Sequence, residues 1–342
     1  MPLIISYAYI EITNACNLNC RSCYNRSGVP HAKREMSFEQ FHLTVDRLVK
    51  LFGCRRISLS GGEPTLHPDF GKMLSLLLQY KDLQISVVTN GTTNNKNLTY
   101  LFNTYDNISM QISLDGSSEA INARTRGPGN FQKAILYTSS LAESAKKPII
   151  RMTVSQYNYD DVEDFFALAV SLGCTPDFDF INGMGNAGDG WPSLELSPMQ
   201  KLGVLRTVNR LNKKYGINAT LPYCTSSCPL TDTDSEHSAL IKYDGSVYPC
   251  QMLYGEKFAL GNILTDDKKA IYAAFRRIAE LARRRVSADY DCEKCLSRDY
   301  CKKGCMAQAD ICSGNPLGND GDCDFRKLQL LGFHAIEQGV LK

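Results

Sequence analysis

Apolar and polar residues alternate along six segments in the first part of the chain. In the first of them, for example, Ile10 and Ile12 flank Glu11. Alternation with a period of two predicts β-strands that have one buried face and one polar face. The six predicted strands cover residues 7–13, 56–60, 84–89, 108–114, 148–155 and 176–181.

Helix signals stand between these segments. Ser37 and Gln40 form a capping box before an apolar-periodic run, and Gly173 predicts the end of another helix. A further helix is expected to begin at Ser197 and to end at Gly216. Strands that alternate with helices favour parallel βα units. The predicted fold class is therefore α/β, with a partial (β/α)6 barrel similar to an incomplete TIM barrel.

The polar face of the predicted strands carries a second signal. Closed eight-stranded barrels usually fill their interior with branched apolar side chains. A polar inner face therefore indicates an open lumen that holds a ligand, and a merely solvated sheet face is the alternative. The polar positions are Glu11, Thr13, Ser58, Ser60, Gln111, Ser113, Arg151, Thr153, Asp177 and Asp179.

Composition narrows the classes of function. The 342 residues include 38 Lys and Arg against 36 Asp and Glu, which gives a net charge of +2. This balance argues against a nucleic-acid surface and against a polybasic membrane patch. No apolar stretch approaches the roughly 20 residues that a membrane span requires, and the N-terminus has no signal segment. The chain is therefore expected to be complete and cytoplasmic.

Fourteen cysteines stand out against this background. A cytoplasmic protein would not keep them as disulfides, so metal binding is the expected explanation. Cys16, Cys20 and Cys23 follow the first predicted strand directly. Three thiolates leave one metal position open, which suggests a 4Fe-4S cluster whose fourth iron binds another group, with a zinc site as the alternative. Cys54 and Cys174 stand alone and are expected to be buried as small apolar side chains.

The C-x3-C-x2-C motif is followed, after the second predicted strand, by a Gly-Gly-Glu-Pro segment that begins at Gly61. Together and in this order, the two motifs resemble those of the radical SAM enzymes, in which S-adenosylmethionine chelates the unique iron of a 4Fe-4S cluster. The resemblance implies that the three cysteines hold this cluster and that Gly61, Gly62 and Glu63 contact the methionine amino group. One departure is Ser22, where the family often has an aromatic residue, with Tyr24 just after the third cysteine.

Two later segments extend the resemblance. The S-L-D-G segment that begins at Ser113 and the R-G-x-G-x-F segment that begins at Arg126 are similar to segments of the family. By this resemblance, Ser113 and Arg126 contact the ribose and carboxylate ends of S-adenosylmethionine, with Arg124 as the competing choice. Asn90 either contacts the cofactor or forms a turn with the glycine that follows it.

The last third of the chain contains nine cysteines, from Cys224 to Cys323. Taken alone, eight of them would suit two zinc ribbons or two iron–sulfur clusters. Their C-x2-C-x5-C-x3-C run, preceded by G-x4-C, resembles the SPASM extension of radical SAM enzymes, which binds two auxiliary 4Fe-4S clusters. We therefore expect two domains, a radical SAM partial barrel over residues 1–218 and a small Cys-rich α+β SPASM domain over residues 219–342.

The SPASM resemblance also implies how the cysteines divide, with Cys312 as a possible substitute for Cys323. The first auxiliary cluster is assigned to Cys224, Cys228, Cys250 and Cys305. The second is assigned to Cys292, Cys295, Cys301 and Cys323.

The resemblance implies a reaction class. Enzymes of this family use an external one-electron donor, such as flavodoxin or ferredoxin, to cleave S-adenosylmethionine to methionine and a 5′-deoxyadenosyl radical. That radical removes a hydrogen atom from the substrate, and auxiliary clusters suit a net oxidation. The non-enzymatic hypothesis is an iron–sulfur electron carrier or a metal-sensing module. The S-adenosylmethionine motifs argue against it.

Two substrate classes stay open. The first is a ribosomally made peptide that is cross-linked or oxidised, and the alternative is a secondary alcohol of a sugar or aminocyclitol. Asp179, Asp177 and Tyr248 are the candidates for the group that accepts a proton. A Gly-rich segment, residues 183–192, is expected to be a substrate lid or an interdomain linker.

Overall fold

The structure is a computed structural model of the 342-residue chain. In the last residues of two helices, 286–287 and 331–337, it describes the backbone alone. The described residues are 4–29, 32–141, 146–220, 228, 230, 237–287, 292, 294–295, 301 and 303–337.

Six parallel strands form the main part of one sheet, and they confirm the six predicted strands to within two residues at each end. They are β1 (Ile5–Thr13), β2 (Arg56–Gly61), β3 (Gln84–Thr89), β4 (Ile108–Ser113), β5 (Ile149–Val154) and β6 (Thr175–Phe180). The sequence did not predict that three further strands continue this sheet beyond β1. They are β7 (His237–Ile241), parallel to β1, and the antiparallel β8 (Ser246–Tyr248) and β9 (Gly261–Asn262). The order is β6-β5-β4-β3-β2-β1-β7-β8-β9.

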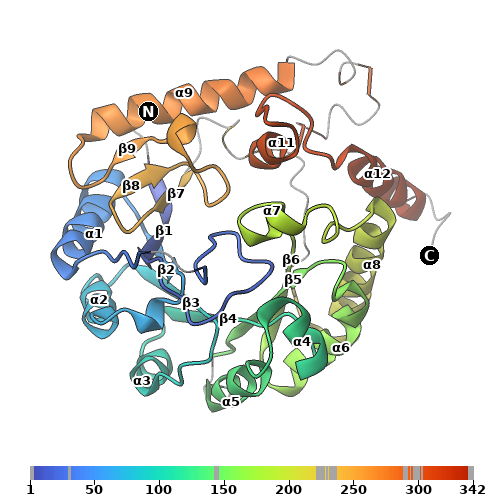
Figure 1. The fold of residues 1–342 in the computed structure, drawn as a ribbon, viewed down its shortest axis with the longest axis horizontal. Helices are drawn as coiled ribbons and strands as arrows, with labels where there is room; N and C mark the ends of the chain where they lie inside the picture. The colour runs from blue at the N-terminus through green and yellow to red at the C-terminus, as the bar shows by residue number, and fades with distance from the viewer. Residues whose placement is uncertain are drawn as a thin grey trace.

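Helices form a ring outside the curved sheet (Figure 1). In the barrel part they are α1 (Phe38–Phe52), α2 (Phe70–Leu77), α3 (Lys96–Thr104), α4 (Glu119–Arg126), α5 (Phe131–Leu141), α6 (Val162–Ser171), α7 (Asn186–Gly190) and α8 (Pro198–Tyr215). Short 3-10 turns, η1 (Pro64–Leu66), η2 (Tyr159–Asp161) and η4 (Glu256–Phe258), join some of the elements. The C-terminal helices are α9 (Lys268–Ser287), α11 (Met306–Ser313) and α12 (Cys323–Glu337).

The predicted helix signals are confirmed. The predicted capping box is present, since the Ser37 hydroxyl accepts from the Gln40 backbone. The helix expected from Ser197 also begins with a capping box, in which the Ser197 hydroxyl accepts from the Gln200 backbone. Gly216 ends α8 in the left-handed conformation, which glycine adopts without steric cost. The helix that Gly173 is predicted to end follows the turn η2 and is α6.

Alternation on the strands separates the core from the lumen. Side chains that face the helices, such as Leu59, Ile112 and Met152, are fully buried. Seven of the ten predicted polar positions line a cavity enclosed by the sheet, which agrees with the predicted polar lumen. The other three, Glu11, Thr13 and Asp177, are buried and do not line it. Cys54 and Cys174 are buried at the ends of helices, as expected.

The C-terminal part reaches both edges of the barrel. At one edge β7 pairs with β1, and at the other α12 packs on α8. Phe180, at the end of β6, meets Phe325 of α12 edge to face, with ring centroids 5.9 Å apart. Figure 1 shows α9, α11 and α12 closing the ring between these edges. The domain boundary at residues 218 and 219 falls between α8 and β7, and it stays a prediction.

Candidate active site

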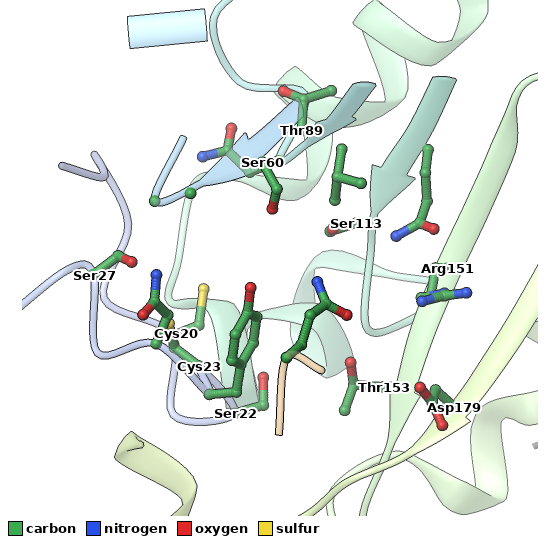
Figure 2. A pocket seen from close by; sticks show the side chains of 18 of the residues that line it. Cys20, Ser22, Cys23, Ser27, Ser60, Thr89, Ser113, Arg151, Thr153 and Asp179 are labelled. Atoms are coloured by element: carbon green, nitrogen blue, oxygen red, sulfur yellow. The ribbon is translucent and has the colours of Figure 1, made fainter. Parts of the chain in front are cut away.

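A cavity of about 350 Å³ lies inside the barrel, between the loop after β1 and the inner face of the sheet. We call residues 14–27 the cluster loop. Figure 2 shows Cys20 and Cys23 of this loop on one side of the cavity and Arg151 and Asp179, from β5 and β6, on the other. The cavity therefore joins the first cysteine group to the polar strand faces, as the sequence predicted.

The three N-terminal cysteines have the chemistry that an iron–sulfur cluster requires. Cys16, Cys20 and Cys23 all line the cavity, and all three are free thiols. Burial raises the pKa of Cys16 to about 11 and that of Cys20 to about 12, although the positive charge of Arg126 opposes the rise at Cys20. In the described part of the chain no three His, Cys, Asp or Glu side chains form a site for a single metal ion. Three thiols on one loop, facing one cavity, fit a cluster that leaves a position open to a ligand.

The two glycines after β2 are needed by the protein's own backbone. A Cβ atom on Gly61 would lie 2.3 Å from the Thr13 carbonyl oxygen, and one on Gly62 would lie 2.1 Å from the Ala15 carbonyl oxygen. The Gly62 N–H donates to the Thr13 carbonyl at 2.8 Å. Both glycines line the cavity, and the close approach that excludes a side chain is to the start of the cluster loop. Their contact with the methionine amino group stays a prediction.

Glu63 lies behind the cavity wall. It is fully buried and is not among the residues that line the cavity. Its carboxylate accepts from the Asn90 backbone N–H and the Thr89 hydroxyl, both at 2.7 Å, and from the Thr65 hydroxyl at 2.6 Å. Burial raises the pKa of Glu63, and these hydrogen bonds oppose the rise. The Glu63 carboxylate thus holds the end of β3 in this structure, and its contact with the methionine amino group stays a prediction.

Asn90 faces the cavity beside the cluster loop. Its amide donates to the Asn17 side-chain oxygen at 2.8 Å and lies 3.9 Å from the Cys16 sulfur. Its side-chain oxygen accepts from the Thr92 backbone at 2.9 Å, which is the predicted turn. Asn90 therefore forms that turn and also lines the cavity.

The two arginine candidates on α4 occupy different environments. Arg126 lines the cavity, and its Nε lies 2.9 Å from a carboxylate oxygen of the fully buried Asp115. Arg124 is exposed and donates to the Tyr157 carbonyl outside the cavity. Ser113, at the end of β4, lines the same cavity as Arg126. The geometry therefore favours Arg126 over Arg124, with much of its charge already balanced by Asp115.

The three candidate proton acceptors are not equivalent. Asp179 is the single carboxylate among the described residues that line the cavity, and its side chain is exposed to it. Asp177, two residues earlier on β6, is buried and forms an ion pair with Arg151. Tyr248 lies on β8, does not line the cavity, and packs edge to face against Tyr254. Of the three candidates, only Asp179 lines the cavity, and its role as proton acceptor stays a prediction.

A buried ion pair that the sequence does not predict links the cluster loop to β7. The fully buried Glu11 of β1 accepts from the Tyr24 hydroxyl at 3.1 Å and pairs with the Lys242 amine at 3.3 Å. The Tyr254 hydroxyl donates to the Tyr24 carbonyl at 3.1 Å. Glu11 had been noted only as a polar strand position, and Lys242 follows β7, which the alternation pattern did not predict.

The Gly-rich segment after β6 supports the cluster loop from the opposite side. The Asn186 side-chain amide donates to the Cys20 carbonyl at 2.8 Å and to the Asn19 side-chain oxygen at 3.0 Å. The Asn186 backbone N–H donates to the Cys23 carbonyl at 2.9 Å. A Cβ atom on Gly185, whose φ is +58°, would lie 2.3 Å from the Cys23 carbonyl oxygen. The segment therefore packs against the cluster loop, and its role as a lid or a linker stays a prediction.

The C-terminal cysteines gather in part as predicted. Cys228, Cys250 and Cys305 interact electrostatically with one another, and burial raises the pKa of Cys250 to about 12. Cys224, the fourth predicted member of this set, lies outside the described residues.

All four cysteines of the second predicted set belong to the described residues. The Cys295 backbone donates to the Cys292 carbonyl at 3.3 Å, while Cys301 and Cys323 both interact with the positive charge of Arg326. Cys312 is exposed, and its sulfur accepts from a glutamine amide one turn earlier in α11. This arrangement favours Cys323 over Cys312, and both assignments stay predictions.

Comparison with known proteins agrees with this geometry. The family model of the radical SAM superfamily matches residues 10–169, and that of the iron–sulfur cluster-binding domain named SPASM matches residues 233–296. The chain is a radical SAM enzyme with a SPASM region. The electron-carrier reading is therefore wrong. Among the described residues, no helix is long and apolar enough to cross a membrane.

Relatives of this radical SAM enzyme match over most of the chain. Mycofactocin maturase MftC from Mycobacterium ulcerans is 28% identical over 336 residues, which cover 92% of this chain and 86% of MftC. The sporulation killing factor maturation protein SkfB from Bacillus subtilis is 30% identical over 267 residues, which cover 75% of this chain and 62% of SkfB. The solved structure of anSMEcpe with bound AdoMet and Kp18Cys peptide has a TM-score of 0.76, with 21% identity and 99% of both chains covered. That structure shows that the fold is shared.

Proposed function

We propose that this radical SAM enzyme matures a ribosomally made precursor peptide by a net oxidation in the barrel cavity. The observation that carries the proposal is Asp179, an exposed carboxylate in the same cavity as Cys16, Cys20 and Cys23. A substrate in this space meets both the cysteines assigned to the catalytic cluster and a group that accepts a proton.

Similar proteins support the substrate class. MftC and SkfB, which match most of this chain, are named as maturation proteins. The anSMEcpe structure, which covers nearly all of the chain, holds a peptide together with AdoMet. Sugar or aminocyclitol dehydrogenation is not favoured, because MftC and SkfB are named for maturation and neither name refers to a sugar or an alcohol.

The cysteines divide the cofactor chemistry between two regions. Cys16, Cys20 and Cys23 would hold the catalytic 4Fe-4S cluster, which with S-adenosylmethionine and a flavodoxin- or ferredoxin-like donor supplies the hydrogen-abstracting radical of this family. The two C-terminal cysteine sets would hold two auxiliary 4Fe-4S clusters, which supply an acceptor for a second electron. Gly61, Gly62, Asn90, Ser113 and Arg126 would form the cofactor side of the cavity.

The strand side chains then bind and orient the substrate. Ser58, Ser86 and Gln111 present hydroxyl and amide groups to the cavity, and these suit the N–H and C=O groups of a peptide backbone. Arg151 is held by its ion pair with Asp177, so its guanidinium stays in one orientation at the cavity wall. These groups hold one C–H bond of the substrate in place while the walls exclude water.

Asp179 completes the oxidation as the proton acceptor. Removal of a hydrogen atom and then of one electron leaves a proton to be lost, and this proton passes to the Asp179 carboxylate. Burial inside the barrel raises the pKa of Asp179, Asp177 raises it further, and Arg151 lowers it. A carboxylate with a raised pKa is a better base near neutral pH than an ordinary one.

Asp179→Asn separates proton transfer from S-adenosylmethionine cleavage. The probes are short peptides encoded next to this gene, incubated with S-adenosylmethionine and dithionite. We expect the variant to form 5′-deoxyadenosine but to lose most of the product whose mass is lower by two hydrogen atoms. In the wild type, product formation should rise with pH as Asp179 loses its proton. Full product formation by the variant, with an unchanged pH profile, would refute the role of Asp179.

The same variant makes a prediction about stability. A carboxyl group whose pKa is higher in the folded state than in the unfolded state destabilises the fold above that folded pKa. Asp179→Asn should therefore raise the melting temperature at neutral pH, and the gain should disappear below the pKa of an unfolded aspartate, about 3.9. A loss of stability at neutral pH would instead make Asp179 a structural residue.

A further inference from the structure

Buried positive charge is concentrated around the C-terminal cysteines. All of the fully or nearly fully buried Lys and Arg side chains in the described part of the chain lie in this region, together with two buried carboxylates. The cations are Lys201, Arg285, Lys303 and Arg326, and the carboxylates are Asp320 and Asp322.

Two of these cations have carboxylate partners. Arg326 donates to both oxygens of Asp320, at 2.8 Å and 2.6 Å. Lys201 of α8 forms an ion pair with Asp322. The positive charge of Arg326, which interacts with Cys301 and Cys323, is therefore largely neutralised by a carboxylate in direct contact.

Arg285 differs from Arg326 in its partners. It is 1% exposed, and its guanidinium donates to the carbonyls of Gly304 at 2.9 Å, Gly318 at 3.1 Å and Lys303. Among the described residues no carboxylate forms an ion pair with it; Asp320, the nearby acid, interacts with it only at longer range. The hydrogen-bonding groups of Arg285 are thus satisfied by neutral carbonyls while its charge remains.

This charge faces the first auxiliary cysteine set. Gly304, which accepts from Arg285, is the residue before Cys305. Arg285 interacts electrostatically with both Cys305 and Cys228. A Cβ atom on Gly304 would lie 2.0 Å from an Asp320 oxygen, so the backbone here is packed tightly between the two arginine sites.

A buried cation changes how easily a nearby cluster accepts an electron. Reduction by one electron adds one negative charge to a cluster, and a positive charge in a low-dielectric site stabilises the reduced form. We propose that Arg285 raises the reduction potential of the cluster held by Cys228, Cys250 and Cys305 above that of the cluster held beside Arg326. This inference rests on the two auxiliary clusters of the proposed function, and it adds an order of electron affinity between them.

The test compares charge with hydrogen bonding at one position. Arg285→Lys and Arg285→Gln both lose part of the hydrogen-bonding fork, but only the glutamine variant loses the charge. The exposed neighbour Arg284→Gln is the matched control. Each full-length chain also carries Cys16, Cys20 and Cys23→Ala, so that electron paramagnetic resonance during a dithionite titration reports the auxiliary clusters alone. Iron, sulfide and zinc are measured on the same samples.

We expect Arg285→Gln to lower one of the two auxiliary potentials. At a fixed potential the ratio of reduced to oxidised cluster should fall at least tenfold, which corresponds to about 59 mV for a one-electron couple. Arg285→Lys and Arg284→Gln should leave the ratio within a few-fold of the parent chain. The signal that moves should be the one that Cys250→Ala removes.

A variant of opposite sign keeps the proposal testable if Arg285→Gln fails to fold. Asp320→Asn removes a negative charge that pairs with Arg326 and also interacts with Arg285. Both auxiliary potentials should therefore rise. Equal shifts in Arg285→Lys and Arg285→Gln, or no rise in Asp320→Asn, would overturn the inference. Zinc in place of auxiliary iron in the parent chain would instead overturn the auxiliary clusters of the proposed function, a result that the metal content shows before any potential is measured.

Discussion

Replacing Asn186 with alanine should loosen the cluster loop without touching a cysteine. Asn186 is the first residue of α7, and Figure 1 shows α7 beside the loop that follows β1. The substitution removes the two side-chain hydrogen bonds to Asn19 and Cys20. It keeps the backbone hydrogen bond to the Cys23 carbonyl, because every residue except proline has that N–H.

The size of the effect follows from these two bonds. A protein hydrogen bond contributes about 0.5–1.5 kcal/mol net, and the Asn186 side chain is partly exposed to water. A combined loss of about 1–2 kcal/mol corresponds to a factor of roughly 5–30 in the population of the opened loop. If iron leaves through the opened loop, its release should accelerate by the same factor.

The assay is iron release to a ferrous chelator from anaerobically reconstituted protein. Asn186→Ala should lose the iron of one cluster about 5–30 times faster than the wild type, while the remaining iron leaves at the wild-type rate. Asn103→Ala, on the exposed face of α3, is the control and should behave as the wild type. Equal release rates in Asn186→Ala and Asn103→Ala would refute the supporting role of the segment after β6.

Three further substitutions test the walls of the site. Glu63→Gln replaces the carboxylate that accepts from the Asn90 N–H with an amide, one half of which can only donate. The variant should lose about 1–3 kcal/mol in the free energy of unfolding and should bind S-adenosylmethionine more weakly. Wild-type stability and affinity in calorimetry would exclude the positioning role. Gly62→Ala forces a Cβ atom against the Ala15 carbonyl and should lower the iron content by the share of one cluster, whereas full iron content would contradict the packing described. Lys242→Met leaves Glu11 buried without its cation and should lower the free energy of unfolding in urea by about 3 kcal/mol. Adding Glu11→Gln should restore most of this stability in the double variant. No restoration would mean that the two residues act separately.

The strands and the first cysteine group could be predicted because their signals are local. A period of two along 6–9 residues specifies a half-buried strand, and each predicted segment became one. The three N-terminal cysteines lie on one short loop, so their sequence spacing alone brings them to one cavity. Gly61 and Gly62 lie at the cavity, but the close approach to Thr13 and Ala15 that excludes a side chain there could not be predicted from their motif.

What the sequence did not show depends on contacts between distant segments. Glu11 and Lys242 are 231 positions apart and meet only because β7 pairs with β1. Asn186 reaches Cys20 from 166 residues away. The motif of Glu63 predicts a cofactor contact, but it does not predict that the Glu63 carboxylate bonds Thr89 and Asn90. The direction of a side chain beside a short turn depends on tertiary packing. A local sequence pattern does not predict that packing.

The most direct test of the central claim compares the wild type with the variant Cys16, Cys20 and Cys23→Ala. Both are reconstituted without oxygen and given S-adenosylmethionine and dithionite, and iron, sulfide and 5′-deoxyadenosine are measured on one sample. The wild type should hold about twelve irons in three four-iron clusters and form 5′-deoxyadenosine. The variant should hold about eight irons and form none. Continued S-adenosylmethionine cleavage by the variant would contradict the assignment of the catalytic site.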